Sequence, residues 1–96
     1  MERSNTRTIR QVIDEFMRGT PLHRRMTERR LVEDWEEVMG KSVARATNRL
    51  YIRDGVLYVH LNSSVLRSEL FMLSKEILRK LNERAGEKVV REIVLK

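Results

Sequence analysis

The 96-residue sequence contains no cysteine, one proline and few aromatic residues: one tryptophan, two tyrosines and two phenylalanines. Without cysteine the chain has no disulfide, no thiolate metal ligand and no cysteine nucleophile, which fits the reducing cytosol. No apolar run approaches the ~20 residues of a membrane-spanning helix. The opening residues MERSNTRTIRQ lack the apolar centre of a signal peptide. We therefore expect a cytoplasmic protein without a membrane segment.

Acidic residues are also fewer than basic residues. The chain carries 20 lysines and arginines against 14 aspartates and glutamates, a formal net charge of +6. Fifteen of the 20 basic residues are arginine, whose planar guanidinium matches phosphate and stacks on flat rings. This balance is compatible with nucleic acid, although many small basic domains bind none. The length predicts one domain over residues 1–96 with a modest core and a frayed start at residues 1–6.

Patterns of catalytic or metal-binding residues are missing as well. His23 and His60 fall in different predicted elements, without the spacing of metal ligands or of a catalytic triad. No glycine-rich phosphate loop is present. An acidic cluster surrounds Trp35, but consecutive helical positions point around a helix, which favours a solvated face over a magnesium or acid–base site. The cluster consists of Glu33, Asp34, Glu36 and Glu37. We expect no cofactor, no small-molecule substrate and no enzymatic activity.

The spacing of apolar residues predicts two helices before any strand. The first runs from an N-cap at Thr8 to a stop at Gly19, with apolar residues at helical intervals between them. The second is predicted to begin at a Thr27 cap and to end at Gly40. Residues 41–46 add a further turn or two. The apolar face of the second helix includes Trp35, which is interpreted as a core anchor, with a binding hot spot as the alternative.

The Asp54-Gly55 dipeptide is the strongest local signal. Between two alternating apolar and polar segments it predicts a β-hairpin with a type I′ turn. The loop length sets the register, with Arg53 opposite Val56 and Tyr51 opposite Tyr58. The predicted core face carries Leu50, Ile52, Leu57, Val59 and Leu61. The predicted outer face carries Arg49, Tyr51, Arg53, Tyr58 and His60.

A long helix and a final strand are predicted after the hairpin. Ser63 or Ser64 caps the helix, which is expected to run without a break to about Ala85 and to end at Gly86. Its apolar stripe comprises Leu66, Leu70, Leu73, Ile77 and Leu81. Its flanks carry Phe71, Met72 and Leu78, which would form a protein-binding groove if they stayed exposed. With a third strand over residues 89–95, the sequence predicts an α+β fold in the order α-α-β-β-α-β. Its three-stranded mixed sheet is expected to have helices mainly on one face.

Two surfaces are candidate binding sites. On the outer hairpin face, Tyr51 and Tyr58 form a predicted cross-strand pair flanked by Arg49, Arg53 and His60. Such rings can stack on bases while the guanidinium groups contact phosphates. In the alternative interpretation, the tyrosines only stabilise the hairpin, or the N-terminal helix covers them.

The second surface is a basic segment before and within the second predicted helix. It comprises Arg24, Arg25, Arg29 and Arg30, with Arg18 just upstream. Helical spacing allows two of these arginines to pair with Glu28 and Glu33. The segment is therefore either a phosphate-binding surface or a partly self-neutralised, solvated face.

Three segments together resemble the DciA-like family of bacterial proteins over residues 8–95. They read LVEDWEEVMGKSVARAT, LYIRDGVLYVHLNSSVLRSELFML and ILRKLNERAGEKVVREIVL. The most specific pieces are Trp35-x-x-Val38-x-Gly40 and Asp54-Gly55-x-Leu57-x-Val59. The resemblance implies a K-homology (KH)-like fold, which agrees with the order of elements. It also implies a role in assisting a DnaB-type replicative helicase onto DNA, with affinity for single-stranded or tailed DNA.

The sequence departs from these patterns in two places. The phosphate-clamping Gly-x-x-Gly loop of KH domains is replaced by Asn62-Ser63-Ser64, so the KH mode of binding is not assumed. Many relatives also carry a flexible C-terminal extension that engages the helicase, whereas this sequence ends at Lys96. Helicase contact is then expected from the globular part, or to be weaker. The alternatives are an RNA-binding KH-like module and a protein-interaction domain that binds no nucleic acid.

Overall fold

The computed structural model describes residues 8–96, and the expectation of a frayed start at residues 1–6 lies outside them. The chain is an α+β fold with one three-stranded sheet. Its elements are α1 (Ile9–Met17), α2 (Pro21–Glu33), α3 (Trp35–Met39), α4 (Lys41–Ala46), β1 (Thr47–Arg53), β2 (Val56–Leu61), α5 (Ser64–Met72), α6 (Ser74–Ala85) and β3 (Glu92–Leu95). The predicted fold class and element order are confirmed. The likeness to a KH domain stays a prediction.

Of the two helix starts predicted in the N-terminal region, the first is confirmed and the second is wrong. Thr8 caps α1 as expected, through a capping box with Gln11. The predicted start of the second helix at Thr27 is wrong. Thr20 caps α2, and Pro21, with its fixed φ, occupies the first turn. Thr27 is instead buried in the middle of α2, where its hydroxyl donates to the carbonyl of His23 at 2.8 Å.

The predicted continuous helix up to Gly40 is divided at Asp34 into α2 and α3. Gly40 separates α3 from α4 with a φ of +90°, which favours glycine. Trp35 is 3% exposed, as the core-anchor interpretation predicted. Its indole N–H donates to the Thr47 hydroxyl at 3.1 Å and thereby fixes the start of β1.

The hairpin has the predicted register, with Tyr51 opposite Tyr58 and Arg53 opposite Val56. Asp54 and Gly55 have φ values of +52° and +77°, as a type I′ turn requires. On the core face, Leu57 and Val59 have no exposed surface. The predicted core positions on β1, Leu50 and Ile52, are partly buried and pack against that core.

β3 pairs with β2 in parallel and begins at Glu92, later than the predicted start at residue 89. The reason is the side chain of Asn82 in α6. Its Oδ1 accepts from the backbone N–H groups of Val89 and Val90, and its Nδ2 donates to the Val90 carbonyl. The backbone before β3 therefore bonds to a side chain rather than to a strand, while Val90 itself is fully buried.

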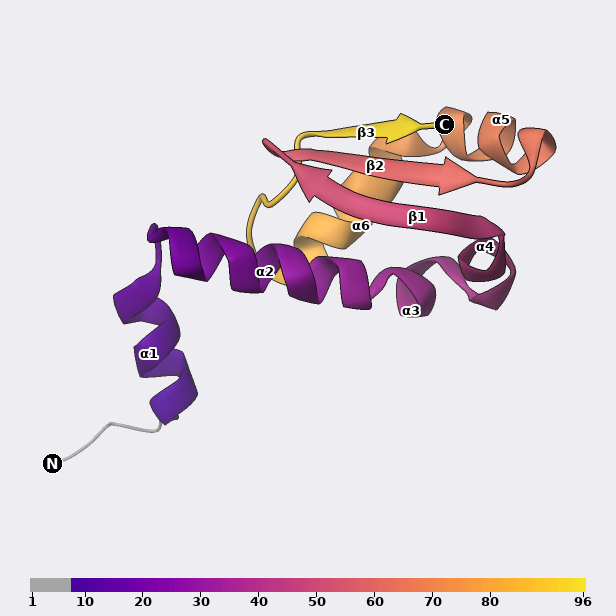
Figure 1. Cartoon of the computed structure of the whole chain (residues 1–96). Coiled ribbons are helices and arrows are strands. Elements are labelled where there is room, and N and C mark those ends of the chain that lie inside the picture. Colours follow the sequence, from indigo (N-terminus) through magenta and orange to yellow (C-terminus); the bar gives the residue numbers. More distant parts are fainter. Residues whose placement is uncertain (1–7) are drawn as a thin grey trace, which may run out of the picture.

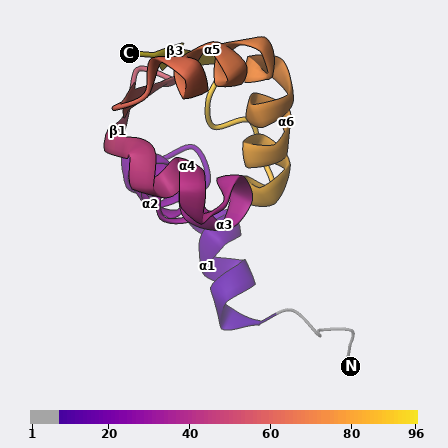
Figure 2. The same cartoon turned by 90° about the vertical axis from the view of Figure 1, so that its right-hand side faces the viewer.

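The predicted unbroken helix over the second half is also wrong, because the chain divides at Leu73 into α5 and α6 (Figure 2). The N–H of Leu73 bonds to the carbonyl of Leu70, and the Ser74 hydroxyl donates to the Phe71 carbonyl at 2.8 Å. These local bonds replace part of the α-helical ladder. As a result Leu73 leaves the apolar stripe and is 50% exposed, whereas Leu70 and Ile77 remain buried.

The helices are distributed unevenly around the sheet (Figure 1). α6 lies behind the sheet in that view, α2 lies below β1, and α1 projects away from the body. The sheet face turned to the viewer is not crossed by any element of the described chain. Within residues 8–96, no helix is both long enough and apolar enough to cross a bilayer.

Candidate nucleic-acid interface

The uncovered sheet face carries a row of three stacked rings. The rings of Tyr51 and Tyr58 are 4.9 Å apart and inclined by only 14°. The ring of His60 lies 5.9 Å from that of Tyr51 and is inclined to it by 27°. The sequence predicted the tyrosine pair from the register alone, and the structure adds the histidine to the same stack. The row comprises Tyr58, Tyr51 and His60, and we call it the aromatic row.

Cations lie over both tyrosines. The guanidinium carbon of Arg49 is 4.7 Å from the centroid of the Tyr51 ring. The ammonium of Lys96 is 5.8 Å from the centroid of the Tyr58 ring. Both distances are within cation–π range. Lys96 was not among the predicted site residues, because its place depends on the register of β3 against β2, which the sequence did not fix.

Two further residues were predicted on this face, Arg53 and His60. Arg53 is exposed at the turn end of β1, on the same face by alternation. His60 is half-buried, and its Nε2 atom is shielded from solvent without a hydrogen-bond partner among the described residues. The N-terminal helix does not cover the tyrosines, because α1 projects away from the body (Figure 1). That part of the alternative interpretation is therefore wrong.

The structure does not gather the four arginines of α2 into one patch. Successive helical positions differ by about 100°, so these side chains spread around the helix. Arg25 and Arg29 are exposed, and Arg30 is half-buried. Arg29 pairs with Glu33 at 3.6 Å, as helical spacing predicted. Arg24 lines a cleft of mixed charge, and none of the three residues of the aromatic row lines that cleft.

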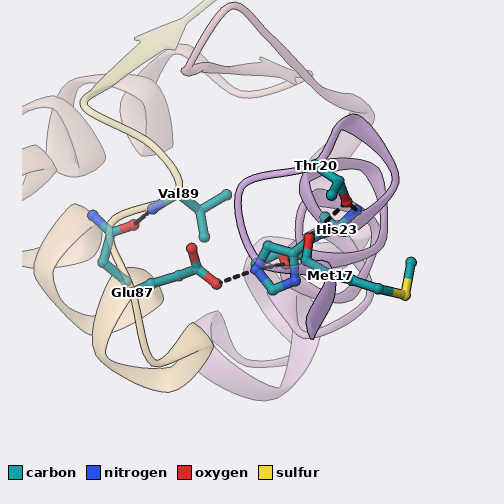
Figure 3. A network of polar contacts seen from close by, with 7 residues as sticks. Met17, Thr20, His23, Glu87 and Val89 are labelled. Carbon is teal, nitrogen blue, oxygen red and sulfur yellow. Dashed lines mark hydrogen bonds and ion pairs between the residues drawn. The ribbon is translucent and has the colours of Figure 1, made fainter. Parts of the chain in front are cut away.

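That cleft, about 690 Å³ in volume, lies between the start of α2, the hairpin turn and the loop before β3. Its basic side chains are Arg24, Lys88 and Arg91, and its acidic side chains are Glu28, Asp54 and Glu87. His23 Nε2 lies 2.7 Å from a Glu87 carboxylate oxygen and ties α2 to this loop (Figure 3). With His23 neutral, these three basic and three acidic side chains give the lining no net formal charge.

The acidic cluster beside Trp35 takes part in ion pairs. Arg84 of α6 reaches the carboxylate of Asp34 at 3.1 Å and also contacts that of Glu37. These contacts join α6 to the junction of α2 and α3. In the described part of the chain, no group of three or more histidines and carboxylates could hold a metal ion.

The family model described as "Dna[CI] antecedent, DciA" matches residues 8–95. A curated relative, the UPF0232 protein of Corynebacterium glutamicum (strain R), is 27% identical over 63 residues. That alignment covers 66% of this chain and 35% of the relative. The chain therefore matches only about a third of the relative's length.

Proposed function

The chain belongs to the DciA family, and from this premise we propose that it is a non-enzymatic DNA-replication adaptor. In this role it contacts a DnaB-type replicative helicase and single-stranded DNA and assists loading of the helicase. The family match supports the association with the helicase. The aromatic row supports the contact with single strands.

The row suits single-stranded nucleic acid for a physical reason. Unpaired bases expose flat faces, and each base stacked on an aromatic side chain contributes ~1–3 kcal/mol. Tyr51 and Tyr58 already lie nearly parallel on a face that no described helix crosses. Arg49 and Lys96 hold positive charge over the same rings; a base that stacks there displaces these long side chains, which can then contact the phosphates of the single strand.

Stacking and phosphate contacts do not by themselves distinguish DNA from RNA. A protein makes that distinction by contacting the 2′-hydroxyl. RNA is accordingly the alternative ligand of the same face, and competition between matched DNA and RNA strands separates the two. Helicase binding without affinity for either nucleic acid would favour the other alternative, a protein-interaction domain that binds no nucleic acid.

The experiment is a titration of the protein into the cognate replicative helicase by biolayer interferometry, with and without a single-stranded oligonucleotide. We expect saturable binding that the oligonucleotide strengthens. The double variant Tyr51→Ala with Tyr58→Ala should keep the binding to the helicase alone. It should lose the strengthening by DNA, with affinity for the free oligonucleotide at least about tenfold lower.

The matched control is Tyr51→Phe with Tyr58→Phe, which keeps both rings and removes only the hydroxyl groups. It should bind the oligonucleotide within about threefold of the wild type, since stacking needs the rings alone. Unchanged DNA affinity in the folded alanine variant would remove the aromatic row from the site. Absence of any helicase binding would contradict the adaptor role.

A further inference from the structure

The two edges of the sheet differ in what covers them. The edge at β1 lies against α2 and α4. β3 is the other edge strand; it contacts α5 and α6, but no described strand pairs with its outer side, which we call the open edge. The backbone groups of Lys96 point toward β2. Its N–H donates to the Val59 carbonyl, and its C=O accepts from the Leu61 N–H, at 2.8 Å each. By alternation, the N–H and C=O groups of Ile93 and Leu95 point away from β2. No described residue pairs with them.

An apolar strip runs beside this open edge. Phe71 and Met72 of α5 are 71% and 78% exposed. With Leu95 of β3, and with Arg67 and Ser68 of α5, they line a groove of about 500 Å³. Figure 2 shows β3 and α5 next to each other along one side of the molecule. Unpaired strand and exposed apolar residues therefore form one continuous surface, which is typical of an interaction site.

The charges at the two ends of β3 indicate what binds there. Proteins commonly guard an open edge with charged residues that repel a second strand. Here the flanking charges are opposite in sign, Glu92 and Lys96, and they lie at equal distances from Val94. An antiparallel copy of β3 centred on Val94 would place each Glu92 opposite the Lys96 of the other copy. Opposite charges in directly facing positions stabilise strand pairing.

The backbone is compatible with the same register. In an antiparallel pair, hydrogen bonds join residues whose N–H and C=O groups point toward the other strand. On the open edge these are Ile93 and Leu95. Centring on Val94 brings each Ile93 opposite the Leu95 of the second copy, so the outward groups of both strands are used. Registers centred on Ile93 or Leu95 would pair fewer of these outward groups, so the backbone favours the register centred on Val94 that the facing charges select.

We propose that the open edge of β3 binds a second copy of this chain, forming a symmetric dimer with a continuous six-stranded sheet. The exposed Phe71 and Met72 of the two copies pack against each other beside the central strands. A two-fold axis perpendicular to the sheet keeps both aromatic rows on the same face. If the proposed function is correct, the dimer offers two single-strand sites on one surface, with a gain in avidity.

The test is sedimentation equilibrium of the full chain without nucleic acid or helicase, so its result does not depend on the proposed function. The wild type should form a dimer with a Kd below about 1 mM, as weak interfaces do. Glu92→Lys and Lys96→Glu should each weaken the dimer by about tenfold, because each creates two like-charged pairs across the axis. The double variant restores both opposite pairs and should return to within about threefold of the wild type.

The two single variants also control for net charge. Glu92→Lys raises the formal charge from +6 to +8, since +6 + 2 = +8, and Lys96→Glu lowers it to +4, since +6 − 2 = +4. General repulsion between basic chains would make the first variant weaker and the second stronger. The proposed pairing makes both weaker. Both positions are exposed, so circular dichroism should show an unchanged fold.

Three outcomes overturn the proposal. The first is a monomer at concentrations up to about 1 mM, where a dimer with the expected Kd would hold at least about half of the chains. The second is a dimer that responds to net charge alone. The third is a dimer that Phe16→Ser breaks while the charge variants leave it intact. Phe16 is 89% exposed on α1, so that result would assign the contact to the N-terminal helix instead.

Discussion

The two faces of the β1–β2 hairpin are built from alternate residues of the same strands but meet different surroundings. Leu57 and Val59 point to one side and have no exposed surface. Tyr58 and His60 are their immediate neighbours in sequence, point to the other side and are half-buried. α6 packs behind the first face, while no described element crosses the second (Figure 1).

This difference separates stability from binding along a single strand. The inner residues hold the sheet to the helices by burial of apolar surface. The outer residues mainly contact one another, through the stacked rings of the aromatic row. A substitution on the outer face should therefore change binding while the fold persists. One on the inner face should lower the stability of the fold. The predictions below test that separation in decreasing order of expected effect.

The largest effect is expected from Leu57→Ala. Leu57 has no exposed surface, so its truncation leaves a cavity in the core and should lower the free energy of unfolding by ~3–4 kcal/mol. The neighbouring variant Tyr58→Ala removes a half-buried ring from the outer face and should lower it by only about 1 kcal/mol. Urea denaturation followed by circular dichroism measures both values. Equal losses in the two variants would break the distinction between the faces.

A smaller loss of stability is expected from Asn82→Ala, which removes the polar contact on the inner side. The substitution deprives two backbone N–H groups and one carbonyl near the start of β3 of their partner. Leaving such buried groups unsatisfied should lower the free energy of unfolding by ~2 kcal/mol.

The control is Asn62→Ala, the same truncation at an exposed residue with a single 3.5 Å side-chain contact. It should cost less than about 0.5 kcal/mol in the same denaturation experiment. A negligible loss for Asn82→Ala would mean that apolar packing alone holds the segment before β3.

The hairpin could be predicted closely because its determinants are local. The positive φ angles that Asp54 and Gly55 adopt readily set a two-residue turn, and the turn fixes every cross-strand pair. The breaks at Asp34 and Leu73 could not be predicted in the same way. Apolar spacing continues through both positions, and each break depends on how the chain packs in three dimensions.

The candidate site was predictable to the same extent as the strands that carry it. Parity along β1 and β2 placed Tyr51, Tyr58 and Arg49 on one face. Lys96 directly follows β3, whose pairing with β2 begins only after the backbone segment that Asn82 binds. Those contacts join residues of separate elements, so no local pattern in the sequence shows them.

The smallest effect concerns the two groups of arginines. For a single strand, each lost phosphate contact lowers the slope of log K against log salt by about 0.7. Arg49→Ala with Arg53→Ala should reduce the slope by about one to two, because both residues lie on the uncovered face. Arg24→Ala with Arg25→Ala should reduce it by at most about one, since carboxylates in the cleft compete for Arg24.

Fluorescence anisotropy with a labelled oligonucleotide between about 50 and 200 mM salt measures these slopes. Lys75→Ala with Lys80→Ala removes the same charge from α6 and should leave the slope nearly unchanged, because α6 lies behind the sheet (Figure 1). If the substitutions on α2 reduced the slope more than those on β1, the oligonucleotide would bind along α2 rather than along the aromatic row. The contrast between the two hairpin faces would then describe stability alone, and the binding surface would have to be sought on α2.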